Sequence, residues 1–326
     1  MTPRPSESFK QFDYSLRPSK QVERKIMIEV LLRLSNAGYA ISEYSYLGLG
    51  SPYYVDFVMF HKYLFIQDMV CVEWASVPKR MRFNKPFKFI KLRLEALATY
   101  IPSMVPSKRY LAWLDYDRSL DVDMLQDIDG CLNRVGSQSI LVVTADARPR
   151  LPEDPFDLDI AAMKPEERDK LTVRTYQEWF GHYIEGKITR STISGVHVAP
   201  LFYAVVAERI RETLAKRGGG LGFFQMFNYV YRDGAPMFTL GGMIGTEEDE
   251  RALNDAGIFR HPFVRPSSDY LEISVPPLTV REKHWLDSRL DKHLTADGLR
   301  FELEEDLLNN YRRFYKEYPT YMETVL

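Results

Sequence analysis

Short apolar runs alternate with helical patterns along the first half of the chain. We expect strands at Tyr44–Leu49, Met69–Val72, Phe87–Leu92, Tyr110–Leu114 and Ser139–Thr144. Helical patterns fall between them, at Tyr54–Leu64, Ala96–Ile101 and Asp121–Val135. This alternation predicts βαβ units and a parallel sheet. The runs are almost continuously apolar, which indicates that helices cover both faces of the sheet.

A further helix is expected before the first strand, with apolar residues at Val22, Ile26, Val30 and Leu34. Ser19 is of a type that caps helix N-termini, and Gly38 is of the type that ends helices. Far downstream, the pattern weakens after Asp146, where prolines and charges become frequent. We expect residues 147–196 to be an insertion after the fifth strand, part of it a lid.

Regular patterns resume after the insertion, with a helix at Val198–Ala215 and strands at Gly222–Tyr231 and Met237–Ile244. Asp233-Gly234 lies between the two strands and is a strong hairpin signal. The last part of the chain predicts helices at Val280–Leu290 and Leu299–Tyr318. The organisation expected is an N-terminal arm and helix (1–40), a main domain (41–275) and a C-terminal helical segment (276–326).

Composition narrows the class of protein. The 326 residues are 45% hydrophobic and 27% charged, which is typical of a globular protein. The formal net charge of −2 argues against a chain-wide nucleic-acid or anionic-lipid surface, but leaves a local basic groove open. Cys71 and Cys131 lie in apolar stretches, and no run approaches the length of a membrane span. We expect a cytoplasmic protein with buried thiols and no membrane partner.

Glycines and acidic residues that could bind a cofactor follow three of the expected strands. Gly48-Leu49-Gly50-Ser51 follows the first strand, and glycines there let the backbone turn tightly and approach a cofactor. Glu73 ends the next strand, where a carboxylate can accept hydrogen bonds from both hydroxyls of an adenosine ribose. The fourth strand ends in Asp115-Tyr116-Asp117, at the edge of the sheet that faces the binding crevice.

With these residues the chain resembles the Rossmann-type S-adenosylmethionine-dependent methyltransferases, over about residues 40–245. The resemblance rests on the glycine turn, Glu73, Asp115–Asp117 and the order of elements. It implies an α/β fold: a Rossmann-like seven-stranded methyltransferase sheet with helices on both faces, an insertion after the fifth strand and a small C-terminal helical appendage. It also implies S-adenosylmethionine as cofactor and methyl transfer as the activity.

The resemblance assigns roles to particular residues. The cofactor-binding set is Gly48, Leu49, Gly50, Ser51, Asp56, Glu73, Trp74 and Asp115. Within it the glycine turn holds the methionine portion and Glu73 the ribose. Asp56 takes the methionine amine, because Tyr46 stands where the family commonly has an acid. Asp115 and Asp117 are the catalytic candidates, which position the acceptor or remove its proton.

The acceptor and the role of a metal are less closely defined. Asp115-Tyr116-Asp117 contains no proline, unlike the Asn/Asp-Pro-Pro-Tyr of amino-group methylation, and this favours an oxygen acceptor. No metal site is expected. The weaker alternative is Mg²⁺ bound by Asp115, Asp117 and Asp146, with one usual ligand missing because Ala147 follows Asp146.

Two other functions stay open at this point. A nicotinamide-dependent oxidoreductase would use the same turn and acid, but Tyr53 stands where G-x-G-x-x-G has its third glycine. A non-catalytic scaffold would account for Tyr46 and Pro52 as departures from the family pattern. The methyl acceptor is expected to be a small molecule or a macromolecule, and nucleic acid stays among the open partners. The basic and aromatic segment Tyr311–Lys316 favours a packing helix or a homodimer contact.

Overall fold

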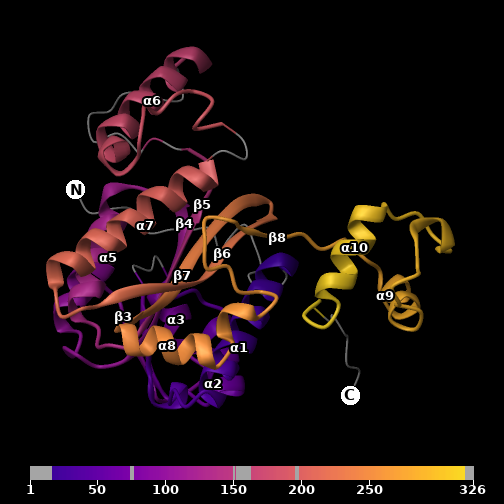
Figure 1. The fold of residues 1–326 in the computed structure, drawn as a ribbon, viewed down its shortest axis with the longest axis horizontal. Helices are drawn as coiled ribbons and strands as arrows, with labels where there is room; N and C mark the ends of the chain where they lie inside the picture. The colour runs from indigo at the N-terminus through magenta and orange to yellow at the C-terminus, as the bar shows by residue number, and fades with distance from the viewer. Residues whose placement is uncertain (1–16, 74–76, 150, 152–162, 195–197, 320–326) are drawn as a thin grey trace.

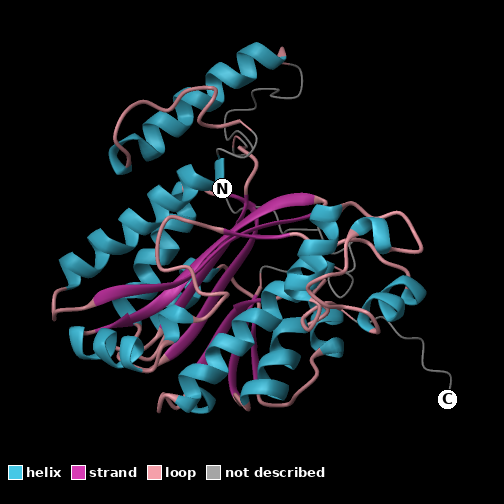
Figure 2. Ribbon diagram, turned by 45° about the vertical axis from the view of Figure 1, so that its right-hand side comes forward, coloured by secondary structure: helices cyan, strands magenta, loops and turns pink. Residues whose placement is uncertain are grey.

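The computed structural model describes residues 17–73, 77–149, 151, 163–194 and 198–319. Eight strands form one sheet in the order β3-β2-β1-β4-β5-β7-β6-β8, with helices on both faces (Figures 1 and 2). The strands are β1 (Ser45–Leu49), β2 (Asp68–Val72), β3 (Ile90–Arg93), β4 (Tyr110–Ser119), β5 (Ile140–Asp146), β6 (Gly222–Asp233), β7 (Ala235–Gly245) and β8 (Leu271–Ile273).

The predicted methyltransferase-like sheet is confirmed, with one strand more than expected. The first five strands are parallel, and β7 runs antiparallel between β5 and β6. The added strand β8 pairs in parallel with the outer side of β6. Its three residues, Leu271–Ile273, are too few to show a period-two pattern in the sequence.

Helices cover both faces of the sheet. The helices are α1 (Pro18–Asn36), α2 (Val55–Leu64), α3 (Pro78–Asn84), α4 (Leu97–Tyr100), α5 (Val122–Arg134), α6 (Pro165–Phe180), α7 (Val198–Arg217), α8 (Glu247–Asp255), α9 (Val280–Asp287) and α10 (Glu305–Phe314). Of these, α6, α9 and α10 lie outside the two layers (Figure 1). Buried residues of α5 and α7 belong to one core cluster, and those of α1, α2 and α8 to another. Because β1, β2, β4 and β5 supply residues to both clusters, these strands are buried on both faces.

The hairpin predicted at Asp233-Gly234 is confirmed, and it has a second role. Gly234 has φ 89°, a conformation that favours glycine, and Asp233 pairs with Ala235 across the turn. The Asp233 carboxylate accepts hydrogen bonds from the backbone N–H groups of Ser19 (3.1 Å) and Lys20 (2.8 Å) in the first turn of α1. The expectation that the Ser19 side chain caps this helix is wrong, since Arg17 is at the N-cap and a distant carboxylate satisfies the amides.

The segment after β5 contains a helix that its weak sequence pattern did not predict. Helix α6 lies beyond the ends of β4 and β5 (Figure 1). Tyr176 of α6 hydrogen-bonds through its hydroxyl to Ser119 at the end of β4 (2.9 Å) and stacks near Phe202 of α7. The insertion therefore packs at the edge of the sheet where the parallel strands end.

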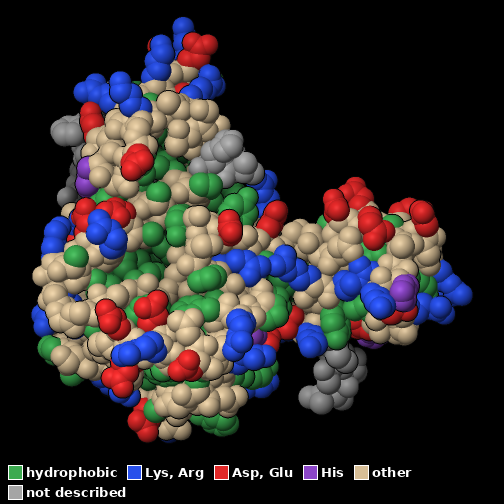
Figure 3. Space-filling view, in the orientation of Figure 1, with side chains coloured by type: hydrophobic (Ala, Val, Ile, Leu, Met, Phe, Trp, Pro, Cys, Tyr) green, Lys and Arg blue, Asp and Glu red, His purple; other side chains and the backbone are tan. Residues whose placement is uncertain are grey.

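The C-terminal helices α9 and α10 form a lobe beside the rest of the fold (Figures 1 and 3). Leu286, Leu308, Tyr311 and Tyr318 are buried together in a third cluster. Phe314 of α10 packs instead against Phe263, with ring centroids 5.9 Å apart, and joins the core next to α1. In the described residues no helix has the length and apolar character needed to span a membrane.

Candidate functional site

Strand register places three of the predicted site residues level with one another. Gly48 pairs with Cys71 of β2 on one side and with Trp113 of β4 on the other. Two residues further along each strand stand Gly50, Glu73 and Asp115. Because side chains alternate along a strand, Glu73 lies on the same face as Cys71, and Asp115 on the same face as Trp113. This face is the one that α1 and α2 cover.

The glycine turn packs tightly against neighbouring side chains. A Cβ on Gly50 would lie 2.3 Å from Cys71 Sγ, and a Cβ on Gly48 would lie 2.5 Å from the Tyr46 hydroxyl. The Gly50 N–H donates to the carbonyl of Val72 at 3.0 Å, which extends the pairing of β1 with β2. Packing within the fold therefore disfavours a side chain at either position.

The turn continues directly into α2. Ser51 accepts a hydrogen bond from the Tyr54 N–H through its carbonyl (3.2 Å) and one from the Tyr53 N–H through its hydroxyl (3.3 Å). Tyr54 then takes up a left-handed conformation, with φ 48°. The first turn of α2 thus begins beside the sheet edge, and it presents Asp56.

The sequence led us to expect an Asp56 carboxylate available to the cofactor amine, but in the structure this carboxylate is already paired. It is buried and forms an ion pair with Nε of Arg24, which α1 brings over the sheet. Arg24 is only 2% exposed, and its Nη1 atom has no hydrogen-bond partner. Any role of Asp56 in binding a cofactor amine is therefore shared with this guanidinium.

Asp115 is paired with a second cation from the same helix. Lys20 Nζ lies 2.8 Å from Asp115 Oδ1, 2.8 Å from Glu23 Oε2 and 4.3 Å from the centroid of the Trp113 ring. The other oxygen of Glu23 accepts a hydrogen bond from the Thr239 hydroxyl. Lys20, Glu23, Arg24, Asp56 and the half-buried Asp115 thus form a buried charge cluster above the end of β1 and the middle of β4, since β4 continues to Ser119 and does not end at Asp115 as predicted.

The burial of this cluster changes the affinity of its members for protons. Desolvation raises the pKa of Glu23, the nearby Asp115 raises it further, and Lys20 opposes both. Desolvation lowers the pKa of Arg24, but the carboxylates of Asp56 and Asp115 outweigh it, so the guanidinium stays charged. Burial also raises the pKa of Tyr46, whose ring packs beneath the cluster against Phe57 and Phe60.

The other predicted site residues are not brought into this cluster. Asp117 is exposed, two residues beyond Asp115 on β4. Asp146 is buried and held by Arg148, which donates through Nε at 2.9 Å. The register places Asp146 opposite Ser119 and not opposite Asp115. Trp74 lies outside the described residues. Among those described, no three His, Cys, Asp or Glu residues are grouped so that they could hold a metal ion.

Sequence reasoning missed the contribution of α1. Lys20, Glu23 and Arg24 look in the sequence like the polar positions of an ordinary amphipathic helix, which are usually solvated. The structure buries all three instead. The only sequence feature that points to their burial is that they lie among the apolar residues Val22 and Ile26. Many surface helices share this pattern, so it does not identify buried charges.

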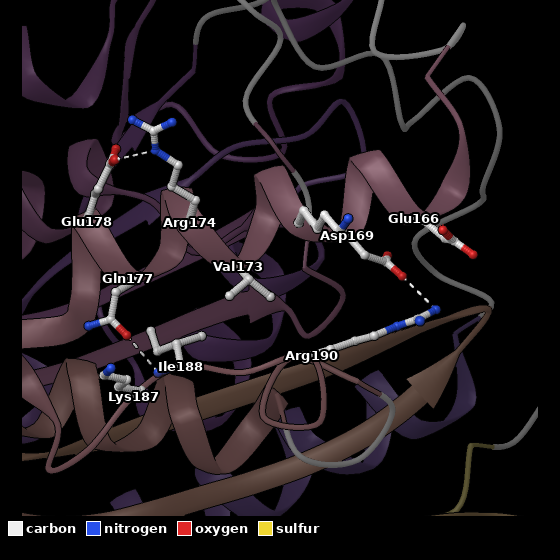
Figure 4. A pocket seen from close by; sticks show the side chains of 10 residues that line it. Glu166, Asp169, Val173, Arg174, Gln177, Glu178, Lys187, Ile188 and Arg190 are labelled. Atoms are coloured by element: carbon white, nitrogen blue, oxygen red, sulfur yellow. Dashed lines mark hydrogen bonds and ion pairs between the residues drawn. The ribbon is translucent and has the colours of Figure 1, made fainter.

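Two open cavities lie near this edge of the sheet. One, of ≈ 780 Å³, follows edge strand β3 and includes Arg93 and Glu95 in its lining. The Glu73 N–H donates to the Arg93 carbonyl at 2.9 Å, so this cavity begins next to the predicted ribose acid. The other, of ≈ 800 Å³, lies on α6 between Val173, Gln177 and Ile188, and charged side chains surround it (Figure 4).

A family model described as "Putative O-methyltransferase" matches residues 12–326. No curated protein matches the sequence. Among solved structures, Trm1 from Pyrococcus horikoshii, in complex with S-adenosyl-L-methionine, is 13% identical, with a TM-score of 0.43 over 72% of this chain and 57% of that chain. The N-methyltransferase NodS from Bradyrhizobium japonicum is 11% identical, with a TM-score of 0.36 over 69% of this chain and 97% of that chain. Spermidine synthase from Thermotoga maritima is 9% identical, with a TM-score of 0.34 over 72% of this chain and 65% of that chain. The chain thus spans less than two thirds of the length of Trm1 and of this spermidine synthase.

Proposed function

This chain belongs to the O-methyltransferase family whose model matches residues 12–326, and we propose that it transfers the methyl group of S-adenosylmethionine to an oxygen atom of an acceptor molecule. The methyltransferase family predicted from the sequence is confirmed by this match. The alternatives of a nicotinamide-dependent oxidoreductase and a non-catalytic scaffold are not favoured by it.

The observation that carries the proposal is the shared level and face of Gly50, Glu73 and Asp115 on three adjacent parallel strands. Strands lie about 4.8 Å apart, so Glu73 and Asp115 are separated by about 10 Å across the glycine turn. This span suits a ligand with ribose hydroxyls at one end and an amino acid at the other. Glu73 is partly exposed, as a carboxylate that accepts hydrogen bonds from a ribose must be.

The charge of the site also fits this cofactor. The buried charge cluster has three carboxyl groups and two cations, so it carries one excess negative charge when Glu23 is ionised and none when the raised pKa of Glu23 keeps that group protonated. S-adenosylmethionine carries a sulfonium, an ammonium and a carboxylate, and therefore a net positive charge. A buried site with excess negative charge stabilises a cation, because the low dielectric strengthens the attraction.

The residues of this chain have distinct tasks in the proposed reaction. When bound, S-adenosylmethionine supplies an electrophilic methyl group on its sulfonium. Glu73 holds the ribose, and the Gly48–Ser51 turn lets the backbone approach the methionine portion. Lys20 fixes the Asp115 carboxylate on β4, level with the end of β1, where it orients the acceptor. Asp117 is exposed one step further out and accepts the proton of the acceptor hydroxyl.

The acceptor would enter from the side of the insertion. Helix α6 packs at the end of β4, and its open cavity is lined by both apolar and charged side chains (Figure 4). We assign acceptor selection to residues 147–196, together with the C-terminal helices. The mixed lining suits an amphipathic acceptor that bears a hydroxyl.

Titration calorimetry tests the proposed cofactor. The purified protein should bind S-adenosylmethionine and S-adenosylhomocysteine with micromolar affinity, and it should not bind NADH or NADPH. Binding of the nicotinamide nucleotides alone would establish an oxidoreductase instead. If none of the four ligands binds, the proposed function is wrong and a scaffold role takes its place. Once cofactor binding is measured, acceptors with hydroxyl groups are screened with and without Mg²⁺.

A further inference from the structure

Arg24 has hydrogen-bonding capacity that its surroundings do not use. Its Nε donates to Asp56, while Nη1 is buried and has no partner in the structure. A guanidinium carries five N–H donors in a fixed fork, and this geometry suits a second carboxylate. Leaving a charged donor buried and unpaired is costly, so a ligand that supplies an acceptor would be bound strongly.

The position of Arg24 decides which ligand group could reach it. Asp56 is in the first turn of α2, directly after the Gly48–Ser51 turn. On the other side, Asp115 lies close enough to affect the pKa of Arg24. The guanidinium is therefore located between the end of β1 and the middle of β4, on the face that carries Glu73 and Asp115. A ligand held by Glu73 at its ribose would extend toward it across the glycine turn.

We propose that Arg24 binds the carboxylate of the methionine moiety of S-adenosylmethionine, with Asp56 holding its guanidinium in place. The proposal rests on the proposed function and adds α1 to the cofactor site. Arg24 then distinguishes ligands with the amino-acid group from adenosine thioethers that lack it. Lys20 does not compete for this role, because Asp115, Glu23 and the Trp113 ring already surround its ammonium.

The competing explanation is that Arg24 and Asp56 form a purely structural ion pair. Such a pair holds α1 against α2 and does not distinguish one ligand from another. The two explanations differ in one measurable quantity, the ratio of affinities for a ligand with the carboxylate and a ligand without it.

The test compares S-adenosylhomocysteine with 5′-methylthioadenosine by titration calorimetry on wild-type protein, Arg24→Met and Arg24→Lys. We expect Arg24→Met to weaken S-adenosylhomocysteine binding by about 10- to 100-fold, the range for a hydrogen bond to a charged group. Binding of 5′-methylthioadenosine should change less than about threefold. The matched control, Arg33→Met, changes an exposed arginine of the same helix and should leave both affinities unaltered.

Arg24→Met removes the partner of a buried carboxylate, so folding is checked by circular dichroism and thermal unfolding. If it does not fold, Arg24→Met combined with Asp56→Asn replaces it, and Arg24→Lys retains the charge without the fork. Equal loss of both ligands, or of neither, in the folded variants overturns the role of Arg24 and leaves the proposed function standing. Failure of wild-type protein to bind either ligand overturns both.

Discussion

The carboxylate of Asp233, at the turn between β6 and β7, accepts a hydrogen bond from the backbone N–H of Lys20 at 2.8 Å, across 213 residues of sequence. The Lys20 side chain meanwhile reaches Asp115 of β4, also at 2.8 Å. The hairpin at one side of the sheet therefore sets where α1 begins, and α1 in turn sets the position of the charge cluster. A turn far from the glycine loop is in this way connected to the candidate cofactor site.

Asp233→Ala should destabilise the protein by about 1–2 kcal/mol, the usual cost of losing an N-terminal helix cap. The amides of Ser19 and Lys20 lose their acceptor, and the first turn of α1 loosens. Urea unfolding measures the free energy of unfolding. The control is Asp255→Ala, which alters an exposed aspartate at the end of α8 and should stay within about 0.5 kcal/mol of wild type. Equal stabilities of the two variants would contradict the cap.

Gly50→Ala should destabilise the protein by about 1–3 kcal/mol, the usual cost of overpacking. The new Cβ would lie 2.3 Å from Cys71 Sγ, so β1 and β2 must shift. Combining it with Cys71→Ala should restore part of the loss, since Met81 then remains as the closest contact, at 3.1 Å. Gly298→Ala is the control, because its Cβ meets nothing nearer than 3.8 Å. A Gly50→Ala protein as stable as wild type would refute this packing.

Glu73→Ala should weaken binding of S-adenosylmethionine by about 10-fold or more, because two charge-assisted hydrogen bonds to the ribose are lost. The free energy of unfolding should change little, since Glu73 is only partly buried at the strand end. Calorimetry measures the affinity, with Glu43→Ala, an exposed acid before β1, as the control. Unchanged affinity in Glu73→Ala would sink the ribose assignment.

Asp127 should make the stability of the protein fall as the pH rises. Burial raises its pKa to about 6, although the Tyr116 hydroxyl donates to it at 2.8 Å. The folded protein therefore binds this proton more tightly than the unfolded chain does. The stabilisation is complete below the unfolded pKa of about 4 and is lost as the pH passes through about 6, with an amplitude of about 1–3 kcal/mol.

Chemical unfolding of wild type and Asp127→Asn between pH 4 and 8 measures this dependence. The variant should lose the part of the decline that belongs to Asp127, because its amide does not ionise; the raised pKa of Glu23 leaves a remainder in both proteins. Asp123→Asn, an exposed position in the first turn of α5, should keep the full decline. Parallel pH profiles for wild type and Asp127→Asn would show that another group is responsible.

The strand and helix pattern could be predicted because it depends on local composition. Buried parallel strands require apolar runs, and their polar ends mark the carboxyl edge, so Gly50 and Glu73 were identified before their register was known. Asp115 was expected to end its strand, but β4 continues to Ser119 because polar residues of β4 are also paired with β5. Strand β8 and helix α6 escaped prediction for a related reason. Their short or weakly patterned segments are stabilised by tertiary packing, as in the contact of Tyr176 with Ser119.

The pairing of charges could not be predicted from residue types. The Asp56 carboxylate was expected to be available to a cofactor amine, but it is paired with Arg24, which lies 32 residues upstream in the sequence. Likewise, Lys20 reaches Asp115 across 95 residues. No spacing rule connects such positions, because these contacts arise only when α1 packs over the end of β1 and the middle of β4.

Chain order and hydrophobic period alone are enough to specify an α/β sheet, its carboxyl edge and the acids that stand on it, because each follows from interactions between near neighbours in sequence. Whether those acids are open or paired depends on which distant helix covers them. Burial makes that choice consequential, since an ion pair such as Arg24–Asp56 interacts far more strongly without water than at the surface. In this protein only the tertiary structure decided that Lys20 and Arg24 of α1 pair with the acids beside the glycine turn.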